Sequence, residues 1–330
     1  MQPPEIEARL IDRPPPDPDE NGQKKTPDML AHEGGSVGIE ALPGRVDRYG
    51  KARKSALDVV DYMENNPAPH LADILKRVKT CGDYLVFRHY FTIDHVKLHG
   101  AQLCTKHLLC KLCAIRRGAK ALAAYLERYE TIKQAQPSLR PYLVTLTVKD
   151  GESLSERFKH LQKCQAELWK QRSRGRGSVL DPVSGAVWSY EIKRGSGSGL
   201  WHPHLHMVAL AENLQTENHR EGTLGAFSRA WHQITGDSFM VDVRPISDPA
   251  SGFLEVFKYA VKFSDQTPAD TVHAFDTLRG RRLIASAGLF RGVPEPVDLL
   301  DDSSALEDLP YITLFYRYLK GTGYIQTQTF

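Results

Sequence analysis

The chain is predicted to be an α+β protein with a ferredoxin-like (split βαβ) antiparallel sheet, preceded by a small helical subdomain that contains cysteines. After Pro137, alternating and helical apolar patterns follow one another in the order β-α-β-β-α-β-α, which matches such a sheet with a helix appended. Before Pro137, helical patterns dominate and Cys104, Cys110 and Cys113 lie close together. A chain of 330 residues with 41% hydrophobic content has room for both parts.

The N-terminal part is predicted to be a disordered tail over residues 1–52. It places six prolines in its first twenty positions, then the glycine-rich stretch GGSVG and scattered charges. Such a composition cannot bury enough apolar surface to order itself. No secretion signal or run of about 18 apolar residues is found, so the expected location is the cytoplasm.

The second segment, residues 53–136, is predicted to be a helical, zinc-binding subdomain. Its helices are SALDVVDYMENN, HLADILKRVKT and a long one over Ala114–Gln134, with the short strand YLVF before the cysteines. In a reducing compartment Cys104, Cys110 and Cys113 favour a metal site over disulfides. Cys81 is the expected fourth ligand of this structural zinc, with His107 as the alternative.

The third segment, residues 137–292, is predicted to be the main domain, and residues 293–330 a C-terminal extension. PYLVTLTV alternates as a strand, and the helix from Leu154 begins after Ser153 with a glutamate three residues on, a capping pattern. AVWSYEIKR and HPHLHMVAL are strands on either side of the turn GSGSG. A helix over 223–234, the strand SFMVDVRPI and a helix opened by Asp248 and Pro249 complete the domain.

Three histidines on one strand suggest a metal site. Strand alternation puts His202, His204 and His206 on one face. Glu191, on the preceding strand, shares that face. It opposes His204 if the turn is centred between residues 197 and 198, and His206 if it is centred one residue later. A carboxylate and two imidazoles suit Mg²⁺ or Mn²⁺, with His202 as a competing third ligand.

The helix FLEVFKYAVKF supplies a candidate nucleophile. Its apolar stripe leaves Glu255, Tyr259 and Lys262 on the opposite face, with Tyr259 one turn from Glu255 and three residues from Lys262. A phenol beside a carboxylate and an ammonium can act as a nucleophile with supporting groups.

These segments together resemble the replication initiator (Rep) proteins of rolling-circle plasmids, within the HUH endonuclease superfamily. The resemblance covers about residues 80–292 and rests on LVTLT, WHPHLHM, EVFKYAVK, CTKHLLCKLCAIRR and RRLIASAGLFRG. It implies that His204 and His206 bind the divalent cation and that Tyr259 attacks DNA, with Lys262 beside it. Glu255 matches the glutamate of the single-tyrosine sub-family.

The resemblance implies a metal-dependent enzyme that nicks and rejoins one strand at a plasmid origin through a 5′-phosphotyrosine. Its partners would be double-strand origin DNA, single-stranded DNA and a host replicative helicase. Alternatives are a related HUH relaxase or transposase, or a non-catalytic zinc-containing DNA-binding regulator.

Positive charge is concentrated in the middle of the chain. The net charge is +3, but residues 1–30 carry −3 and residues 295–310 carry −6, so the remainder carries +12. Such a balance suits a polyanionic partner. The expected DNA-contacting residues lie in the stretch WKQRSRGRG, predicted to be a flexible loop, and at the start of the long helix: Lys170, Arg172, Arg174, Arg176, Arg116 and Arg117.

Overall fold

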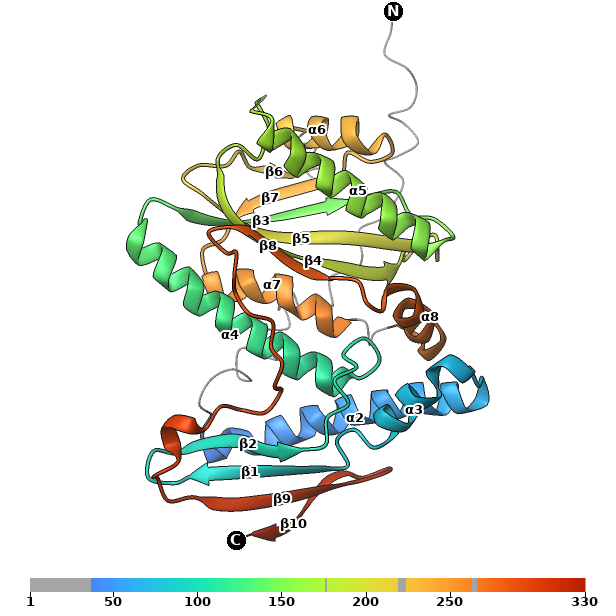
Figure 1. Cartoon of the computed structure of the whole chain (residues 1–330), viewed down its shortest axis with the longest axis vertical. Coiled ribbons are helices and arrows are strands. Elements are labelled where there is room, and N and C mark those ends of the chain that lie inside the picture. The colour runs from blue at the N-terminus through green and yellow to red at the C-terminus, as the bar shows by residue number, and fades with distance from the viewer. Residues whose placement is uncertain (1–36, 176, 219–223, 263–265, 330) are drawn as a thin grey trace, which may run out of the picture.

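Two antiparallel sheets with helices between them form the protein (Figure 1). The computed structural model describes residues 37–175, 177–218, 224–262 and 266–329, without the side chains of residues 258–262. Within these ranges, no helix has the length and apolar character needed to cross a membrane.

The larger sheet has six strands in the order β6-β7-β3-β5-β4-β8. Its strands are β3 (Arg140–Thr147), β4 (Val183–Arg194), β5 (Trp201–Ala211), β6 (Glu217–Asn218), β7 (Val241–Pro245) and β8 (Ile284–Gly288). The central order β7-β3-β5-β4, with helices after β3 and before β7, is that of a ferredoxin-like sheet. The predicted fold class is therefore confirmed. The edge strands β6 and β8 were not predicted.

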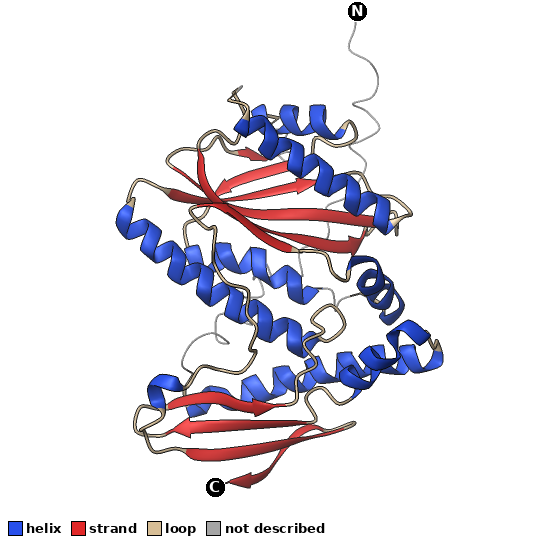
Figure 2. Ribbon diagram, in the orientation of Figure 1, coloured by secondary structure: helices blue, strands red, loops and turns tan. Residues whose placement is uncertain are grey.

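Helices cover both faces of the larger sheet (Figure 2). One face carries α5 (Leu154–Ser173) and α6 (Ala226–Thr235), and the other carries α4 (Lys111–Ala135) and α7 (Pro249–Lys262). On β4, Tyr190 packs against Phe158 of α5, with ring centroids 5.1 Å apart. Because side chains alternate along a strand, the odd-numbered residues of β4 face α7.

The helix starts agree with the capping residues read from the sequence. Ser153 Oγ accepts a hydrogen bond from the Glu156 amide at 3.3 Å. Asp248, just before α7, accepts from the amides of Ala250 and Ser251 in its first turn at 3.2 and 3.1 Å. These caps satisfy amides that have no partner inside the helix.

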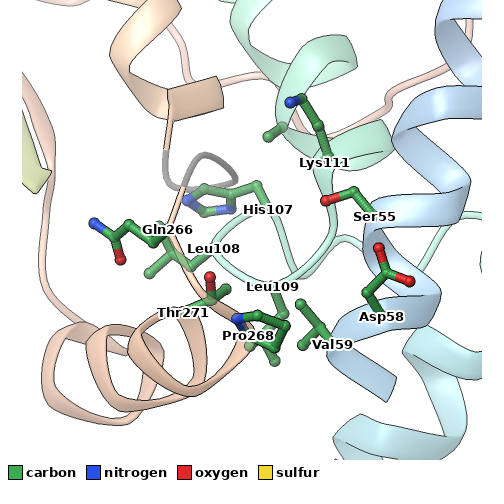
Figure 3. Close-up of a pocket in the computed structure, with 11 residues that line it drawn as sticks. Ser55, Asp58, Val59, His107, Leu108, Leu109, Lys111, Gln266, Pro268 and Thr271 are labelled. Carbon is green, nitrogen blue, oxygen red and sulfur yellow. The ribbon is translucent and has the colours of Figure 1, made fainter. Parts of the chain in front are cut away.

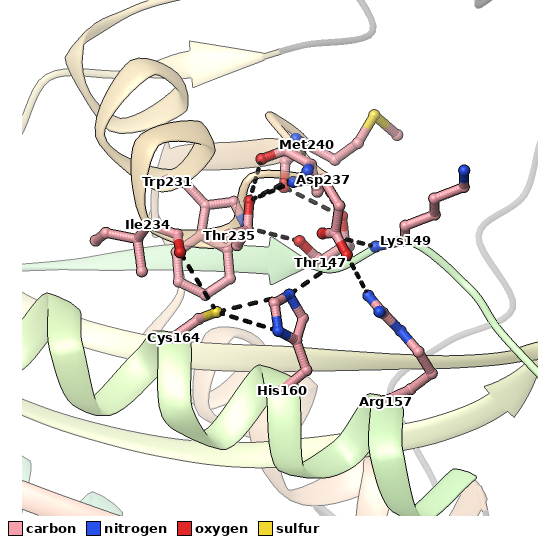
Figure 4. Close-up of polar contacts among 11 residues, drawn as sticks. Thr147, Lys149, Arg157, His160, Cys164, Trp231, Ile234, Thr235, Asp237 and Met240 are labelled. Carbon is pink, nitrogen blue, oxygen red and sulfur yellow. Dashed lines mark hydrogen bonds and ion pairs between the residues drawn. The ribbon is translucent and has the colours of Figure 1, made fainter. Parts of the chain in front are cut away.

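A polar cluster joins α5 to the segment between α6 and β7 (Figure 4). Asp237 lies between Arg157, at 2.6 Å, and His160, at 3.3 Å. The Trp231 indole donates to the Thr147 carbonyl at 2.6 Å. Cys164 of α5 is 4% exposed beside them.

The smaller sheet combines strands from both ends of the chain in the order β10-β9-β1-β2. Its strands are β1 (Tyr84–Tyr90), β2 (His95–Ala101), β9 (Ile312–Leu319) and β10 (Gly323–Thr329). Helix α2 (Leu42–Asn65) packs with it, and α3 (Ala72–Lys79) packs against α2. The residues predicted to be a separate C-terminal extension therefore complete the N-terminal subdomain, which is not purely helical.

Part of the segment that was predicted to be a disordered tail, residues 1–52, is folded in the structure. Helix α2 starts at Leu42, and Leu42, Val46 and Tyr49 are buried at helical spacing. This apolar stripe was not recognised in the sequence because arginines lie between its apolar positions. Arg45 and Arg53 are nevertheless 1% and 2% exposed, since both find carboxylate partners far along the chain.

Further elements were not read from the sequence. Helix α8 (Pro268–Leu278) lies beside the β4-β5 hairpin, where Arg194 pairs with Asp270 at 2.6 Å. Short 3-10 helices span Ile39–Ala41, Pro69–Leu71 and Ser304–Leu306.

Candidate active site

The β4-β5 hairpin places the predicted metal ligands on one face, although in the described part of the chain only the four cysteines discussed below have donor atoms that all lie within 4.8 Å of one another. Glu191 pairs with His204 in register, so the turn is centred between residues 197 and 198, the first of the two predicted arrangements. Glu191, His204 and His206 are 4%, 9% and 7% exposed. All three lie on the face that packs against α7, because Glu191 is odd-numbered on β4 and cross-strand partners share a face.

His206 is held by hydrogen bonds at both ring nitrogens. Its Nε2 lies 3.0 Å from Glu191 Oε2, and its Nδ1 lies 3.2 Å from the Thr145 hydroxyl on β3. Burial lowers the pKa of His206, and the neighbouring Glu191 only partly offsets this effect. A lowered pKa favours the neutral imidazole at neutral pH, which is the form that binds metal ions.

His202 extends the row of imidazoles. Its ring centroid lies 4.3 Å from that of His204, and the centroids of His204 and His206 are 6.1 Å apart. His202 is half-buried and lies on the opposite side of His204 from His206. It is therefore placed to act as a third ligand beside His204, whereas Glu191 lies beside His206.

Helix α7 packs against the face that carries the histidines, close to His206. Ser189, the register partner of His206, donates a hydrogen bond from its hydroxyl to the Val256 carbonyl of α7 at 2.6 Å. Glu255 is next to Val256, and its charge acts on His206 to raise the pKa. Tyr259 and Lys262 follow at one and two turns along the same helix, but their side chains lie outside the described residues.

A basic cavity of about 430 Å³ lies between this face and the cysteine-containing subdomain. Ser189 lines one end of it, together with Arg117 and Arg282. Glu295 pairs with both arginines, at 2.7 Å from Arg117 and 3.6 Å from Arg282. The acidic segment, residues 295–310, thus places the Glu295 carboxylate beside two arginines that lie close to the histidine site.

The second predicted metal centre is a compact cluster of four buried cysteines. The sulfur atoms of Cys81, Cys104, Cys110 and Cys113 all lie within 4.8 Å of one another. Cys81 Sγ is 3.5 Å from Cys110 Sγ and 3.6 Å from Cys113 Sγ, and Cys104 Sγ is 3.6 Å from Cys113 Sγ. Four sulfurs bound tetrahedrally to one zinc at about 2.3 Å would be about 3.8 Å apart. The cluster therefore has the size that a tetrahedrally coordinated zinc ion requires.

The surrounding backbone supports thiolate ligands. The Cys104 amide lies 3.3 Å from Cys81 Sγ, and the Lys106 amide lies 3.5 Å from Cys104 Sγ. Hydrogen bonding to Cys104, together with burial, raises the pKa of Cys110 and of Cys113. Four adjacent thiols cannot all ionise without a cation to offset their charge, so the arrangement fits a bound metal.

Cys81 is the fourth member of the compact cluster, which does not include His107. The His107 ring instead lines a cavity of about 130 Å³ between α2 and α8 (Figure 3). Burial in this position lowers the pKa of His107 to about 4. The spacing of the sulfur atoms therefore favours Cys81 over His107 as the fourth ligand of a bound metal.

The predicted DNA-contacting residues divide into exposed and buried groups. Arg116 is 0% exposed and bonds to Asp301, Tyr49 and the Leu299 carbonyl, which corrects its expected role in binding DNA. A basic residue after a cysteine pair suggested a surface element, but here it satisfies a buried carboxylate. Arg117 remains partly exposed, at 23% of its side chain.

The stretch WKQRSRGRG was predicted to be a flexible loop, but it begins as helix. Lys170 and Arg172 lie in the last turn of α5. Arg172 donates to the carbonyls of Leu180 and Val183, so it holds the following loop in place. Lys170 and Arg174 are exposed beside Glu167, and Arg176 lies outside the described residues.

Comparison with known proteins identifies the family of the chain. Residues 95–310 match the model of a family described as "Replication protein". The chain is 24% identical over 239 residues to "Protein rep" of Streptococcus pneumoniae serotype 2 (strain D39 / NCTC 7466), covering 68% of this chain and 72% of that protein. It is 23% identical over 266 residues to "Protein rep" of Bacillus sp, covering 71% and 84%.

A third relative is "Protein rep" of Lactiplantibacillus plantarum, 24% identical over 245 residues, covering 68% of this chain and 75% of the relative. No solved structure matches the chain. Because the family model matches well over half of its residues, the chain belongs to this family of replication proteins, as the resemblance of its motifs predicted.

Proposed function

We propose that this replication protein initiates rolling-circle replication of a plasmid by nicking and rejoining one strand at the origin. The observation that carries the proposal is the common face of Glu191, His204 and His206, with α7 packed beneath it through Ser189 and Val256. Glu255 of α7 is next to Val256 at that face, and Tyr259 follows Glu255 by one helical turn. The named relatives are all called "Protein rep", which supports the same role.

A divalent cation would be held by His204, His206 and Glu191, with His202 as the alternative to Glu191. Two imidazoles and a carboxylate suit Mg²⁺ or Mn²⁺ and leave coordination positions for phosphate oxygens. When bound, such an ion polarises a phosphate and offsets the charge that develops on it. Thr145 would orient His206 for this task through its bond to Nδ1.

Tyr259 is the proposed nucleophile. Its phenolic oxygen would form a bond to the scissile phosphorus as the bond from phosphorus to the 3′ oxygen breaks. The products are a 5′-phosphotyrosyl enzyme and a free 3′ oxygen. This oxygen takes up a proton to become a hydroxyl, which can prime synthesis. A free phenol with a pKa near 10 reacts slowly at neutral pH, so Lys262 would favour the ionised form.

Glu255 is proposed to act at the end of the cycle. It is half-buried and close enough to His206 to influence its charge. A carboxylate there could take a proton from water or from a second hydroxyl, which would allow a closing cleavage without a second tyrosine.

The cysteine cluster is proposed to hold a structural zinc, and the basic surface to hold DNA. Zinc would fasten the start of α4 to the segment before β1 and so fix Arg117 near the catalytic face. Arg117, Lys170, Arg174 and Arg176 are proposed to contact phosphates of origin DNA or single strands. A host replicative helicase is the proposed protein partner.

The proposal is tested by incubating the protein with an origin-derived single strand and Mn²⁺. His206→Ala should lose nicking, because the imidazole that meets both Glu191 and Thr145 is gone. His232→Ala removes an exposed histidine on α6, across the sheet, and should nick normally.

Two results would contradict the proposal. One is Mn²⁺-independent nicking that survives His206→Ala. The other is origin binding without any nicked product, which would instead indicate a non-catalytic DNA-binding regulator.

A further inference from the structure

The outer face of the smaller sheet is a candidate binding surface distinct from the catalytic face. Residues on the inner face, Leu85, Phe87, Leu98 and Leu314, are 0–8% exposed and belong to the core shared with α2. The outer face is formed by the alternate positions. Its side chains include Tyr84, Val86, Arg88, Lys97, Thr313, Phe315, Arg317, Leu319 and Ile325.

Aromatic rings on this face are arranged to accept flat partners. Tyr84 and Phe315 have parallel rings, 9° apart, with centroids separated by 5.9 Å. Near the other end of β9, the Arg88 guanidinium lies 4.2 Å from the centroid of the Tyr311 ring. Tyr84 and Tyr311 are 37% and 39% exposed. Tyr311 and Phe315 are four residues apart on an extended chain, about 13 Å, which leaves room for two separate bases.

The charge of the sheet favours an anionic partner. Strands β1, β2, β9 and β10 contain no aspartate or glutamate. They contain Arg88, Lys97 and Arg317, and in the described part of the chain no carboxylate lies within ion-pair distance of Arg88 or Arg317. Aromatic rings interleaved with cations suit a nucleic-acid strand, whose bases stack while its phosphates pair with the cations.

We propose that the outer face of this four-stranded sheet binds single-stranded DNA. Bases would stack on Tyr84, Phe315 and Tyr311, and phosphates would meet Arg88 and Arg317. A four-stranded antiparallel sheet backed by helices, with exposed rings on its strands, is an established geometry for holding unpaired bases. The source of the strand rests on the proposed function, since nicking at an origin releases one. Strands β1, β9 and β10 lie outside residues 95–310, so this surface lies largely outside the family match.

The test is the fluorescence anisotropy of a labelled oligothymidylate bound to the full chain without added Mg²⁺ or Mn²⁺, where nicking does not interfere. Phe315→Leu keeps the apolar volume but removes the ring, and it should weaken binding about tenfold. Phe315→Tyr should bind as the wild type does. Arg317→Ala should lower the slope of log affinity against log salt by about 0.7, the value for one phosphate contact on a single strand.

Lys320→Ala is the matched control for charge. Lys320 lies in the same β9-β10 hairpin but pairs with Asp61 of α2 at 3.4 Å, so its removal should leave the salt slope unchanged. Thermal unfolding of each variant checks that the sheet is intact. A folded Phe315→Leu that binds oligothymidylate as tightly as the wild type would overturn the proposal.

Two other results would also overturn it. One is a duplex bound as tightly as the single strand and equally weakened by Phe315→Leu. The other is a concentration-dependent dimer that dissociates into monomers in the Phe315→Leu variant, which would make this face a contact between two copies of the chain. The binding assay needs no catalysis, so a protein that binds oligothymidylate through Phe315 but nicks nothing would contradict only the proposed function.

Discussion

Asp301 should be one of the most important single residues for the stability of the smaller subdomain. Its carboxylate accepts from Arg45 at 2.8 Å and from the Leu98 amide at 2.6 Å, and it also pairs with Arg116. Arg45 and Arg116 are 1% and 0% exposed. Asp301→Ala would therefore leave two buried guanidinium groups without their carboxylate.

The expected loss follows from that burial. Removing one partner of a buried ion pair costs about 3–5 kcal/mol, because the remaining charge stays out of water. At about 2–4 °C per kcal/mol, the midpoint of thermal unfolding should fall by about 6–20 °C. Asp298→Ala is the matched control, since Asp298 is exposed and, among the residues that the structure describes, bonds only to the Leu300 amide, at 2.9 Å.

The contribution of Asp301 should also depend on pH. Burial alone would raise the pKa of Asp301, but the combined attraction of Arg116 and Arg45 outweighs it and lowers the pKa. A lowered pKa means that the stabilisation is complete above the unfolded value of about 3.9 and is lost as the pH falls through the folded value. The stability difference between wild type and Asp301→Asn should therefore be full at neutral pH and shrink in acid.

Thermal unfolding followed by circular dichroism, at neutral pH and in acid, measures both effects. The reasoning is refuted if Asp301→Ala destabilises no more than Asp298→Ala. It is also refuted if the difference between wild type and Asp301→Asn grows as the pH falls.

Three further predictions concern the cysteines and the acidic segment. The purified chain should hold one zinc, and Cys113→Ser should release it; metal analysis that finds no zinc in the wild type would contradict the site. Cys164 should resist iodoacetamide in the native state, because it is 4% exposed and burial raises its pKa to about 11; rapid alkylation before unfolding would contradict this placement. Glu295→Gln should strengthen binding of single-stranded DNA, since it frees Arg117 and Arg282, and weaker binding would show that Glu295 only orders the segment.

The main domain was predictable because its signals are local. Alternation in HPHLHMVAL, the cap at Ser153 and the composition of GSGSG each depend on a few neighbouring residues. They predicted the strands and the shared face of Glu191 and the histidines, but they left two hairpin registers open, and the structure has the one that pairs Glu191 with His204. Local patterns therefore carried the sheet and the candidate ligands.

The parts that were missed depend on contacts between distant residues. Thr145 meets His206 only because β3 and β5 are neighbours, and Ser189 meets Val256 only because α7 crosses the same face. The smaller sheet joins β1 to β9, more than 200 residues later, which no local pattern indicates. Arg116 was misassigned for the same reason, since its partner Asp301 is 185 residues away.

The central claim is that Tyr259 becomes linked to DNA beside the histidine face. Its most direct test is mass spectrometry of the wild-type protein after reaction with a cleavable origin single strand and Mn²⁺, to identify the residue that carries the nucleotide. We expect a 5′-phosphotyrosyl bond at Tyr259. A covalent link at any other residue, or nicked DNA with no protein attached, would contradict it.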